Sequence, residues 1–311
     1  MNTYPLSYIQ PDDDPLDIRK DNVFKAVFTK DTPESMGALS RLVSALIDRN
    51  VTIVSMLANE PPFGNTRDRQ VRFDINCRAE NGELVNVEMC FNPMPFEPVR
   101  MEFYAAKLFT GQDIKGTDKN FNDLKQAYQI AILAKYKFFQ DEIFLHNFAY
   151  YDSVNRIPLN GRTRIITLEL SKLAAIAEKP SREMSVSELW AVYFAYLTDS
   201  SKRGKINEIV ELEEGIAMAS SVLMTVSRDE EERARIMRDE KIELDWQSYM
   251  SWAKKEGHSQ GLAEGRAEGR AEGIEQEREE SHEYFLKLLD QGLSVDEIKQ
   301  QLQHRKEVVS G

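Results

Sequence analysis

The segment 68–91 constrains the fold more than any other part of the sequence. Two runs, DRQVRFDINCRA and ELVNVEMCF, flank Glu80-Asn81-Gly82 and are typical of two antiparallel strands. Asp74, Asn86 and Glu88 are even-numbered, whereas apolar residues fill the odd positions: Val71, Phe73, Ile75, Cys77, Val85, Val87, Met89 and Phe91. Because residues directly opposite each other share a face, the numbers of paired residues must add to an even value.

This parity selects the turn between the two strands. A two-residue Asn-Gly turn would pair Glu80 with Glu83 and would put the two apolar rows on opposite faces. A three-residue turn with Gly82 in the left-handed bulge position pairs Ala79 with Glu83 instead. The same register places Asp74 opposite Glu88.

Two carboxylates that face each other in this way repel, because their Cβ atoms are only ~4.5 to 5.5 Å apart. A hard divalent cation between Asp74 and Glu88 would remove the repulsion. The alternative is that both residues lie on the solvated polar face of an antiparallel hairpin. The residues of the hairpin alone leave both interpretations open.

Apolar periodicity predicts the elements around the hairpin. DNVFKAVF, from Asp21, and PESMGALSRLVSALIDRN, from Pro33, have helical spacing, and Thr32 caps the second helix. VTIVSML, from Val51, predicts a strand. Further along, RMEFYAAKLFTGQD predicts a helix, NFNDLKQAYQIAILAKYKFF a helix or a buried strand, and RTRIITLELSKL another strand. An apolar helix at 184–197 and a charged helical region at 206–255 follow.

Composition indicates a folded protein with reduced thiols. A chain of 311 residues with 41% apolar content can bury a core. No run approaches the ~18 to 20 apolar residues that span a bilayer, and residues 1–15, rich in proline and aspartate, predict a flexible arm rather than a secretion signal. Cys77 and Cys90 are too few for a disulfide framework. We therefore expect a cytoplasmic protein.

The net charge of -12 opposes a nucleic-acid partner, because phosphate binding favours a basic surface. The acid excess lies mostly after residue 170, however, so a local patch in the first half is still compatible with DNA binding that salt weakens steeply. Arg67, Arg69 and Arg72 are candidates for phosphate contacts, although exposed strands commonly carry such residues.

Glycine recurs at every fourth position from Gly257 to Gly273, in a run built on Ala-Glu-Gly-Arg tetrads. Each glycine inside a helix costs ~1 kcal/mol relative to alanine, so the run implies either a frayed linker or helices packed closely enough to favour small residues. A linker is the simpler interpretation, and self-association of two copies is the alternative. After it, the sequence predicts a helix, a stop at Gly292 and a helix begun by a capping box of Ser294 and Glu297.

Taken in order and with their spacing, these segments resemble the Rpn (recombination-promoting nuclease) or putative-transposase family of PD-(D/E)XK nucleases. DNVFKAVF resembles the family's opening helix, RFDINC its strand with an acidic residue, and LVNVEMC its glutamate strand. RMEFYAAKL, with Gln112 and the run 128–133 after it, resembles the family's Arg-x-x-x-Tyr helix and the segments next to that helix. ITLELSKL and the Ala-Glu-Gly-Arg tetrads resemble later signatures of the family.

The resemblance implies an α/β fold with a restriction-endonuclease-like core, in which helices flank a mixed sheet. We expect this nuclease-like domain at 16–200, after the arm at 1–15. A charged helical region at 201–256, the tetrad segment at 257–280 and a C-terminal helix pair at 281–311 would complete the chain.

Enzymes of this kind hold Mg²⁺, with Mn²⁺ as a substitute, between two carboxylates, a main-chain carbonyl and the scissile phosphate. By resemblance the ligands here are Asp74, Glu88 and the carbonyl of Met89. At the third motif position, where the family has Lys or often Gln, this chain has Cys90, and a thiol is too weak a hydrogen-bond former to orient the attacking water in the same way. Arg100 or Lys107, on the following helix, is expected to supply a displaced positive charge. Asp21 or Lys25, on the opening helix, is expected to line the same cleft.

Three functions are compatible with this pattern. The first is a metal-dependent DNA endonuclease linked to recombination or mobile elements. The second is a catalytically degenerate nuclease fold that binds DNA or a protein partner, because Cys90 replaces the expected residue. The third is an assembly protein driven by the tetrads, which needs no metal at Asp74 and Glu88. The histidines are scattered without ligand spacing, which favours structural roles for them.

Overall fold

The computed structural model describes residues 8–59, 72–112, 114 and 120–309. It divides into two compact units, Met1–Glu240 and Lys241–Gly311. Among the described residues, no helix combines the length and the apolar character needed to cross a membrane.

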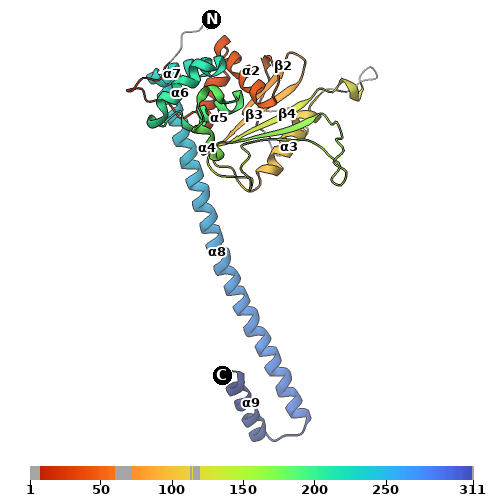
Figure 1. Cartoon of the computed structure of the whole chain (residues 1–311). Coiled ribbons are helices and arrows are strands. Elements are labelled where there is room, and N and C mark those ends of the chain that lie inside the picture. Colours follow the sequence, from red (N-terminus) through yellow and green to blue (C-terminus); the bar gives the residue numbers. More distant parts are fainter. Residues whose placement is uncertain (1–7, 60–71, 113, 115–119, 310–311) are drawn as a thin grey trace. The chain divides into compact units, whose positions relative to one another are not determined.

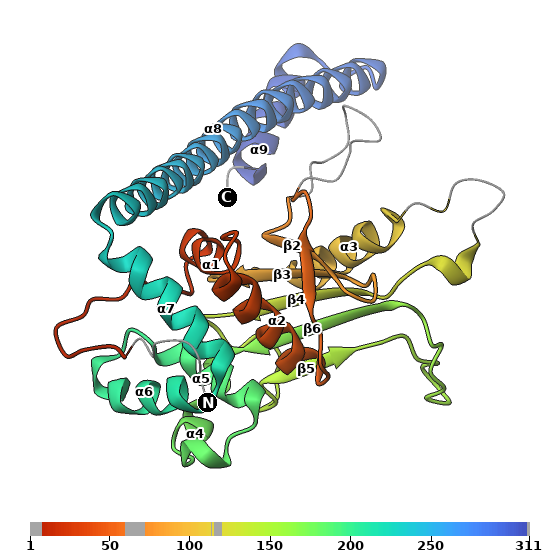
Figure 2. The same ribbon diagram turned by 90° about the horizontal axis from the view of Figure 1, so that it is seen from above.

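A six-stranded mixed sheet forms the centre of the first unit (Figures 1 and 2). In spatial order its strands are β1 (Ile53–Met56), β2 (Ile75–Ala79), β3 (Leu84–Cys90), β4 (Ala127–Leu133), β6 (Thr163–Glu169) and β5 (Leu145–Phe148). Strands β3, β4 and β6 are parallel to one another, and the outer pairs β1–β2, β2–β3 and β5–β6 are antiparallel. A mixed sheet flanked by helices is the α/β fold that the sequence predicts.

The register of the β2–β3 hairpin is the predicted one. Ile75 pairs with Val87, and Cys77 pairs with Val85. The N–H of Ala79 donates to the carbonyl of Glu83 over 2.9 Å, and the N–H of Gly82 donates back to the Ala79 carbonyl over 2.8 Å. Gly82 has a φ of 86°, the left-handed conformation that the three-residue turn requires.

Helices cover both faces of the sheet, so β3 is buried along its whole length. The odd-numbered residues of the hairpin face a large core that is shared with α1 (Asp21–Phe28), α2 (Pro33–Ile47), α5 (Val186–Tyr196) and α7 (Glu214–Arg228). The even-numbered residues face α3 (Glu97–Thr110), which packs across β3, β4 and β6 on the other side (Figure 2).

The alternation of faces ends at Asp74. The prediction that Phe73 shares a face with the other odd-numbered apolar residues of the hairpin is therefore wrong. Phe73 packs with Leu84 and Leu108 on the α3 side, where its ring centroid lies 5.5 Å from that of Tyr104. The chain bends at Asp74, one residue before β2 begins, and the N–H of Phe73 donates to the Asn59 carbonyl instead of continuing the ladder with β3. A bend at this point reverses the face on which the preceding side chain lies.

The predicted helices around the hairpin form. Thr32 accepts a hydrogen bond from the Ser35 N–H over 3.2 Å at the start of α2, as its capping role requires. Segment 120–139, left open between helix and strand, contains the buried parallel strand β4. Strand β5 has no counterpart in the sequence prediction, because its four residues lack apolar alternation. Short helical turns complete the unit: α4 (Ala174–Ala177), η1 (Phe121–Asp123), η2 (Leu170–Lys172), η3 (Ser181–Glu183) and η4 (Ser200–Lys202).

Two segments that the sequence set apart from the nuclease-like domain pack onto its core. Helices α6 (Arg203–Leu212) and α7 follow residue 200, yet α7 lies against α1 and α2. Residues 8–15, expected to be a flexible arm, include the buried Ile9, whose N–H donates to Asn207 Oδ1 over 3.0 Å.

Helix α8 (Glu230–Asp290) continues without a break through the glycine tetrads, so the structure replaces the expected linker with helix. The predicted stop follows: Gly292 has a φ of 73°, and the Ser294 N–H donates to the Glu297 carboxylate over 2.9 Å at the start of α9 (Val295–Val309). Leu288 of α8 and Ile298 of α9 are both buried, and the Tyr284 hydroxyl of α8 donates to Gln301 Oε1 of α9 over 3.3 Å.

The hairpin turn makes a testable prediction about glycine. Gly82→Ala should lower the free energy of unfolding by ~1 kcal/mol, because alanine in the left-handed conformation is strained. Gly204→Ala is the matched control, because Gly204 lies in α6 with open space around its Cα. This variant should raise the free energy of unfolding by up to ~1 kcal/mol, since alanine favours helix more than glycine does. Urea denaturation of both variants measures the two changes. Equal effects of the same sign would refute the role of the turn.

Candidate active site

Asp74 and Glu88 lie together at one end of the hairpin, on the side of the sheet that α3 covers. Glu88 is only 2% exposed, and the Asp74 side chain is 15% exposed. The backbone N–H of Met89, next to Glu88, donates to Asp74 Oδ2 over 3.3 Å. The solvated polar face is therefore excluded, because Asn76, Asn86 and Glu88 are all buried.

Each of the two carboxylates has its own cation, and the two cations come from opposite faces of the sheet. Lys25 of α1 lies with its ammonium 2.9 Å from Asp74 Oδ1 and 2.8 Å from the carboxylate of Asp21. Arg100 of α3 donates from Nη2 to Glu88 Oε2 over 2.9 Å. The structure thus brings together predicted site residues from three elements, with Lys25 and Arg100 as the positive charges.

Three further polar residues belong to this site. The amide of Asn86 donates both to Glu88 Oε1, over 3.0 Å, and to Gln129 Oε1 on β4, over 2.8 Å. Arg100 also lies 3.3 Å from Glu97, a carboxylate that is itself buried. Asn86, Gln129 and Glu97 were not identified as site residues from the sequence. The available signal was a lone polar residue, Gln129, inside the apolar run of β4.

Burial and neighbouring carboxylates raise the pKa of both Asp74 and Glu88. Burial first, and then the charge of Asp74, raises the pKa of Glu88 to about 8, although Arg100 opposes the shift. Burial and the charge of Asp21 raise the pKa of Asp74 as well, against the effect of Lys25. Lys25 and Arg100 therefore do not offset the combined effect of burial and of the neighbouring carboxylates on these two pKa values.

A family model describes most of this chain. The model of the PD-(D/E)XK nuclease family transposases matches residues 18–253. The chain belongs to this family. Comparison with curated proteins and with solved structures gave no match. The matched range includes the hairpin, the sheet and both helices that supply the cations.

Cys90, expected from the sequence at the third position of the PD-(D/E)XK motif, is buried among apolar side chains. Cys90 packs with Met101, Ala131 and Leu133 under α3. Burial, reinforced by the charges of Glu97 and Glu88, raises the pKa of its thiol well above the usual range. Cys90 is therefore a neutral packing residue, and it offers neither a positive charge nor a strong hydrogen-bond donor to the carboxylates.

Of the other predicted site residues, Met89 is in contact with a carboxylate, because its N–H donates to Asp74. Lys107 lies further along α3, with its ammonium 5.7 Å from the centroid of the Phe103 ring. Arg72 is exposed just before the bend at Asp74. Arg67 and Arg69 lie outside the described residues. Met89 contributes its N–H to the site, and its carbonyl stays a proposed ligand.

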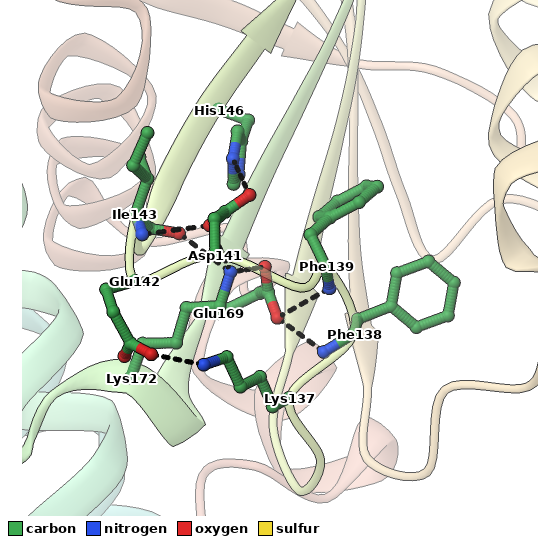
Figure 3. Close-up of polar contacts among 9 residues, drawn as sticks. All are labelled: Lys137, Phe138, Phe139, Asp141, Glu142, Ile143, His146, Glu169 and Lys172. Atoms are coloured by element: carbon green, nitrogen blue, oxygen red, sulfur yellow. Dashed lines mark hydrogen bonds and ion pairs between the residues drawn. The ribbon is translucent and has the colours of Figure 1, made fainter.

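A second group of potential metal ligands lies in the same unit of this nuclease-family chain. Ligand atoms of Asp141, His146 and Glu169 all lie within 4.8 Å of one another (Figure 3). His146 Nε2 is 3.1 Å from Asp141 Oδ2, and both oxygens of Glu169 are engaged, one of them by the N–H groups of Phe138 and Phe139. Sequence spacing gave no indication of this cluster.

An ammonium already fills the second group. Lys172 donates to Asp141 Oδ1 over 2.7 Å, to Glu169 Oε1 over 2.5 Å and to the Ile143 carbonyl over 3.0 Å, which uses all three of its protons (Figure 3). Both Lys172 and Glu169 have fully buried side chains, so a divalent cation would have to displace a buried lysine. The geometry favours a structural role, in which the cluster fixes the segment between β4 and β5 to the end of β6.

The raised pKa of Glu88 predicts a pH dependence of stability. The folded domain binds this proton up to about pH 8, whereas the unfolded chain releases it near the ordinary value of 4.5. The stability that protonated Glu88 contributes is therefore complete below the unfolded pKa and is lost as the pH rises to about 8. Glu88→Gln should be increasingly more stable than the wild type across this window.

Thermal unfolding at a series of pH values measures this difference. Glu188→Gln is a control of opposite sign, because hydrogen bonds from Lys179 and Ser185 lower the pKa of Glu188 although burial opposes them. A constant difference between wild type and Glu88→Gln over the whole range would show that the pKa of Glu88 is not raised.

Proposed function

We propose that this chain is a cytoplasmic, metal-dependent endonuclease that hydrolyses phosphodiester bonds in DNA, linked to recombination or mobile elements. The observation that carries the proposal is the pair Asp74 and Glu88: Asp74 lies just before β2, Glu88 lies on the adjacent strand β3, and the N–H of Met89, next to Glu88, donates to Asp74. Membership of a nuclease-type transposase family supports the same chemistry.

The residues of the site fit a hard divalent cation. Asp74 and Glu88 offer carboxylate oxygens, and the carbonyl of Met89 is the third proposed ligand, which matches the oxygen ligands that Mg²⁺ or Mn²⁺ prefers. Burial is the main cause of the raised pKa of both carboxyls, and a bound cation would favour their ionised form over the protonated one. A bound divalent cation would supply the Lewis acidity that activates water and neutralises a departing oxygen.

In this proposal the chain's own cations replace the missing Lys or Gln of the motif. Lys25 has a side chain that is 28% exposed and an ammonium beside Asp74, so it can orient a water molecule or a phosphate oxygen there. Arg100 has a 34% exposed side chain whose planar guanidinium suits phosphate oxygens. Asn86 keeps Glu88 Oε1 oriented from within the sheet.

The proposed partner is DNA, reached through a local site rather than through the overall charge. The net charge of -12 means that binding should weaken steeply as salt increases. Two sites acting together can cut both strands of a duplex in one encounter, and we propose that copies of the chain self-associate through the C-terminal helical region.

A second candidate function is a degenerate nuclease fold that binds DNA or a protein without cutting. Two observations favour it. Cys90 is buried among apolar side chains, and Glu88 has each of its oxygens engaged, one by Asn86 and the other by Arg100. On this view Arg100 would permanently take the place of a metal ion.

Plasmid nicking at low salt with Mg²⁺, Mn²⁺ or EDTA tests the endonuclease. We expect metal-dependent cutting by the wild type and its loss, by at least about a hundredfold, in Asp74→Ala and in Glu88→Ala, because each variant removes a proposed ligand. His146→Gln in the second cluster is the control and should cut like the wild type. A folded wild-type chain that cuts nothing would favour the degenerate fold, and loss of cutting in His146→Gln would move the metal to the second cluster.

Substitution of Cys90 separates the two candidate functions. In an active enzyme whose positive charge comes from Lys25 or Arg100, Cys90→Gln or Cys90→Lys should change the rate only modestly. In a degenerate fold, the same substitution restores the motif and can create cutting that the wild type lacks. Initial nicking rates, with circular dichroism to verify folding, measure the difference.

A further inference from the structure

The glycines of the tetrad segment lie in the middle of α8 and have open space around them in the described part of the chain. A Cβ atom built on Gly257, Gly261, Gly265, Gly269 or Gly273 would meet no atom within 4 Å. None of them has a positive φ among the described residues. Because glycine weakens a helix relative to alanine, neither backbone conformation nor internal packing explains why glycine recurs at these positions.

These glycines are all exposed and recur every four residues along α8. Residues four apart lie nearly above one another on a helix, displaced by only ~40° per step. The same row continues towards the N-terminus through Ala253 to Tyr249, whose ring is 57% exposed and lies 6.0 Å from the rings of both Trp246 and Trp252. The row therefore consists of small residues with exposed aromatic residues at one end.

Charges of opposite sign flank the row. A glutamate precedes Gly265, Gly269 and Gly273, and an arginine follows the first two of these. On a helix, neighbours in sequence are ~100° apart, so Glu264, Glu268 and Glu272 lie along one side of the row and Arg266 and Arg270 along the other. One copy of α8 thus presents an acidic edge and a basic edge on either side of a smooth face.

Symmetry decides which orientation of two copies makes these edges complementary. In a parallel pair the twofold axis runs along the helices, so the acidic edge of each copy faces the basic edge of the other. In an antiparallel pair the axis is perpendicular to the helices, and like edges face each other, which is unfavourable. The charges therefore favour a second, parallel copy of the same chain.

We propose that two copies of this protein pair in parallel through the glycine row of α8, Gly257 to Gly273. The glycines let the two backbones approach closely, and Glu and Arg of the tetrads pair across the interface. Rows with a four-residue spacing lead to helices that cross at an angle, near ~40 to 50°, rather than to a long coiled coil, so the contact is confined to the tetrads and their neighbours. This specifies the self-association proposed above, and it does not depend on nuclease activity.

Light scattering with size-exclusion chromatography of the full-length chain tests whether the glycine row is the dimer interface. Gly265→Gln with Gly269→Gln puts long side chains on the proposed interface, and the matched control, Ala263→Gln with Ala267→Gln, puts the same side chains on the opposite side of α8. Glutamine favours helix in both variants. We expect a dimer for the wild type and the control, and a dissociation constant raised at least about tenfold for the glycine variant.

Cross-linking tests the orientation. A cysteine at Gly257 should be joined to the same residue of the second copy by a short bis-maleimide, because a parallel pair places equal positions side by side. In an antiparallel pair Gly257 would lie beside Gly273, and the two Gly257 residues would be ~24 Å apart. The wild-type chain is the control, since Cys77 and Cys90 are buried.

Salt provides a second measure of orientation. A parallel pair should weaken as ionic strength rises, because it gains from opposite charges, whereas an antiparallel pair should tighten. A monomeric wild type, equal dissociation constants for the two glutamine variants, or a dimer that salt strengthens would each overturn the proposal. None of these outcomes bears on whether Asp74 and Glu88 support DNA cleavage.

Discussion

Glu88 carries an acidic group into a strand that is buried on both faces, and the rest of the site depends on how this charge is accommodated. A carboxylate in such a position must be paired or protonated, since burial disfavours the ionised form. Arg100 and Asn86 each engage one of its oxygens, and its pKa is nevertheless raised to about 8. The position of α3 over β3 is therefore an electrostatic requirement as well as a packing arrangement.

The site draws its positive charges from helices on opposite sides of the sheet. Lys25 reaches Asp74 from α1, and Arg100 reaches Glu88 from α3, while Cys90 of β3 packs among apolar side chains. The two helices thus place cations beside the carboxylates, and β3 itself contributes none. The cluster around Lys172 shows the contrasting arrangement, in which a buried ammonium satisfies the acidic groups completely.

Much of the fold and the centre of the site could be predicted from the sequence. The parity of apolar residues determined the three-residue turn at Gly82 and the pairing that brings Asp74 to Glu88, and capping patterns located helix starts at Thr32 and Ser294. Phe73 was placed on the wrong face because a bend interrupts the alternation, which a pattern of period two cannot reveal. Strand β5 and the Lys172 cluster gave no periodic signal at all.

The sequence by itself determined which residues share a face, because this follows from local backbone geometry and from the spacing of apolar residues along one strand or helix. Only the tertiary structure decided which cation serves which carboxylate, that Gln129 of β4 lies beside Asn86, and that Glu88 is buried rather than solvated. These facts depend on elements distant in the chain packing against the same strand. Their contacts are set by the placement of whole helices and strands, which no local pattern encodes.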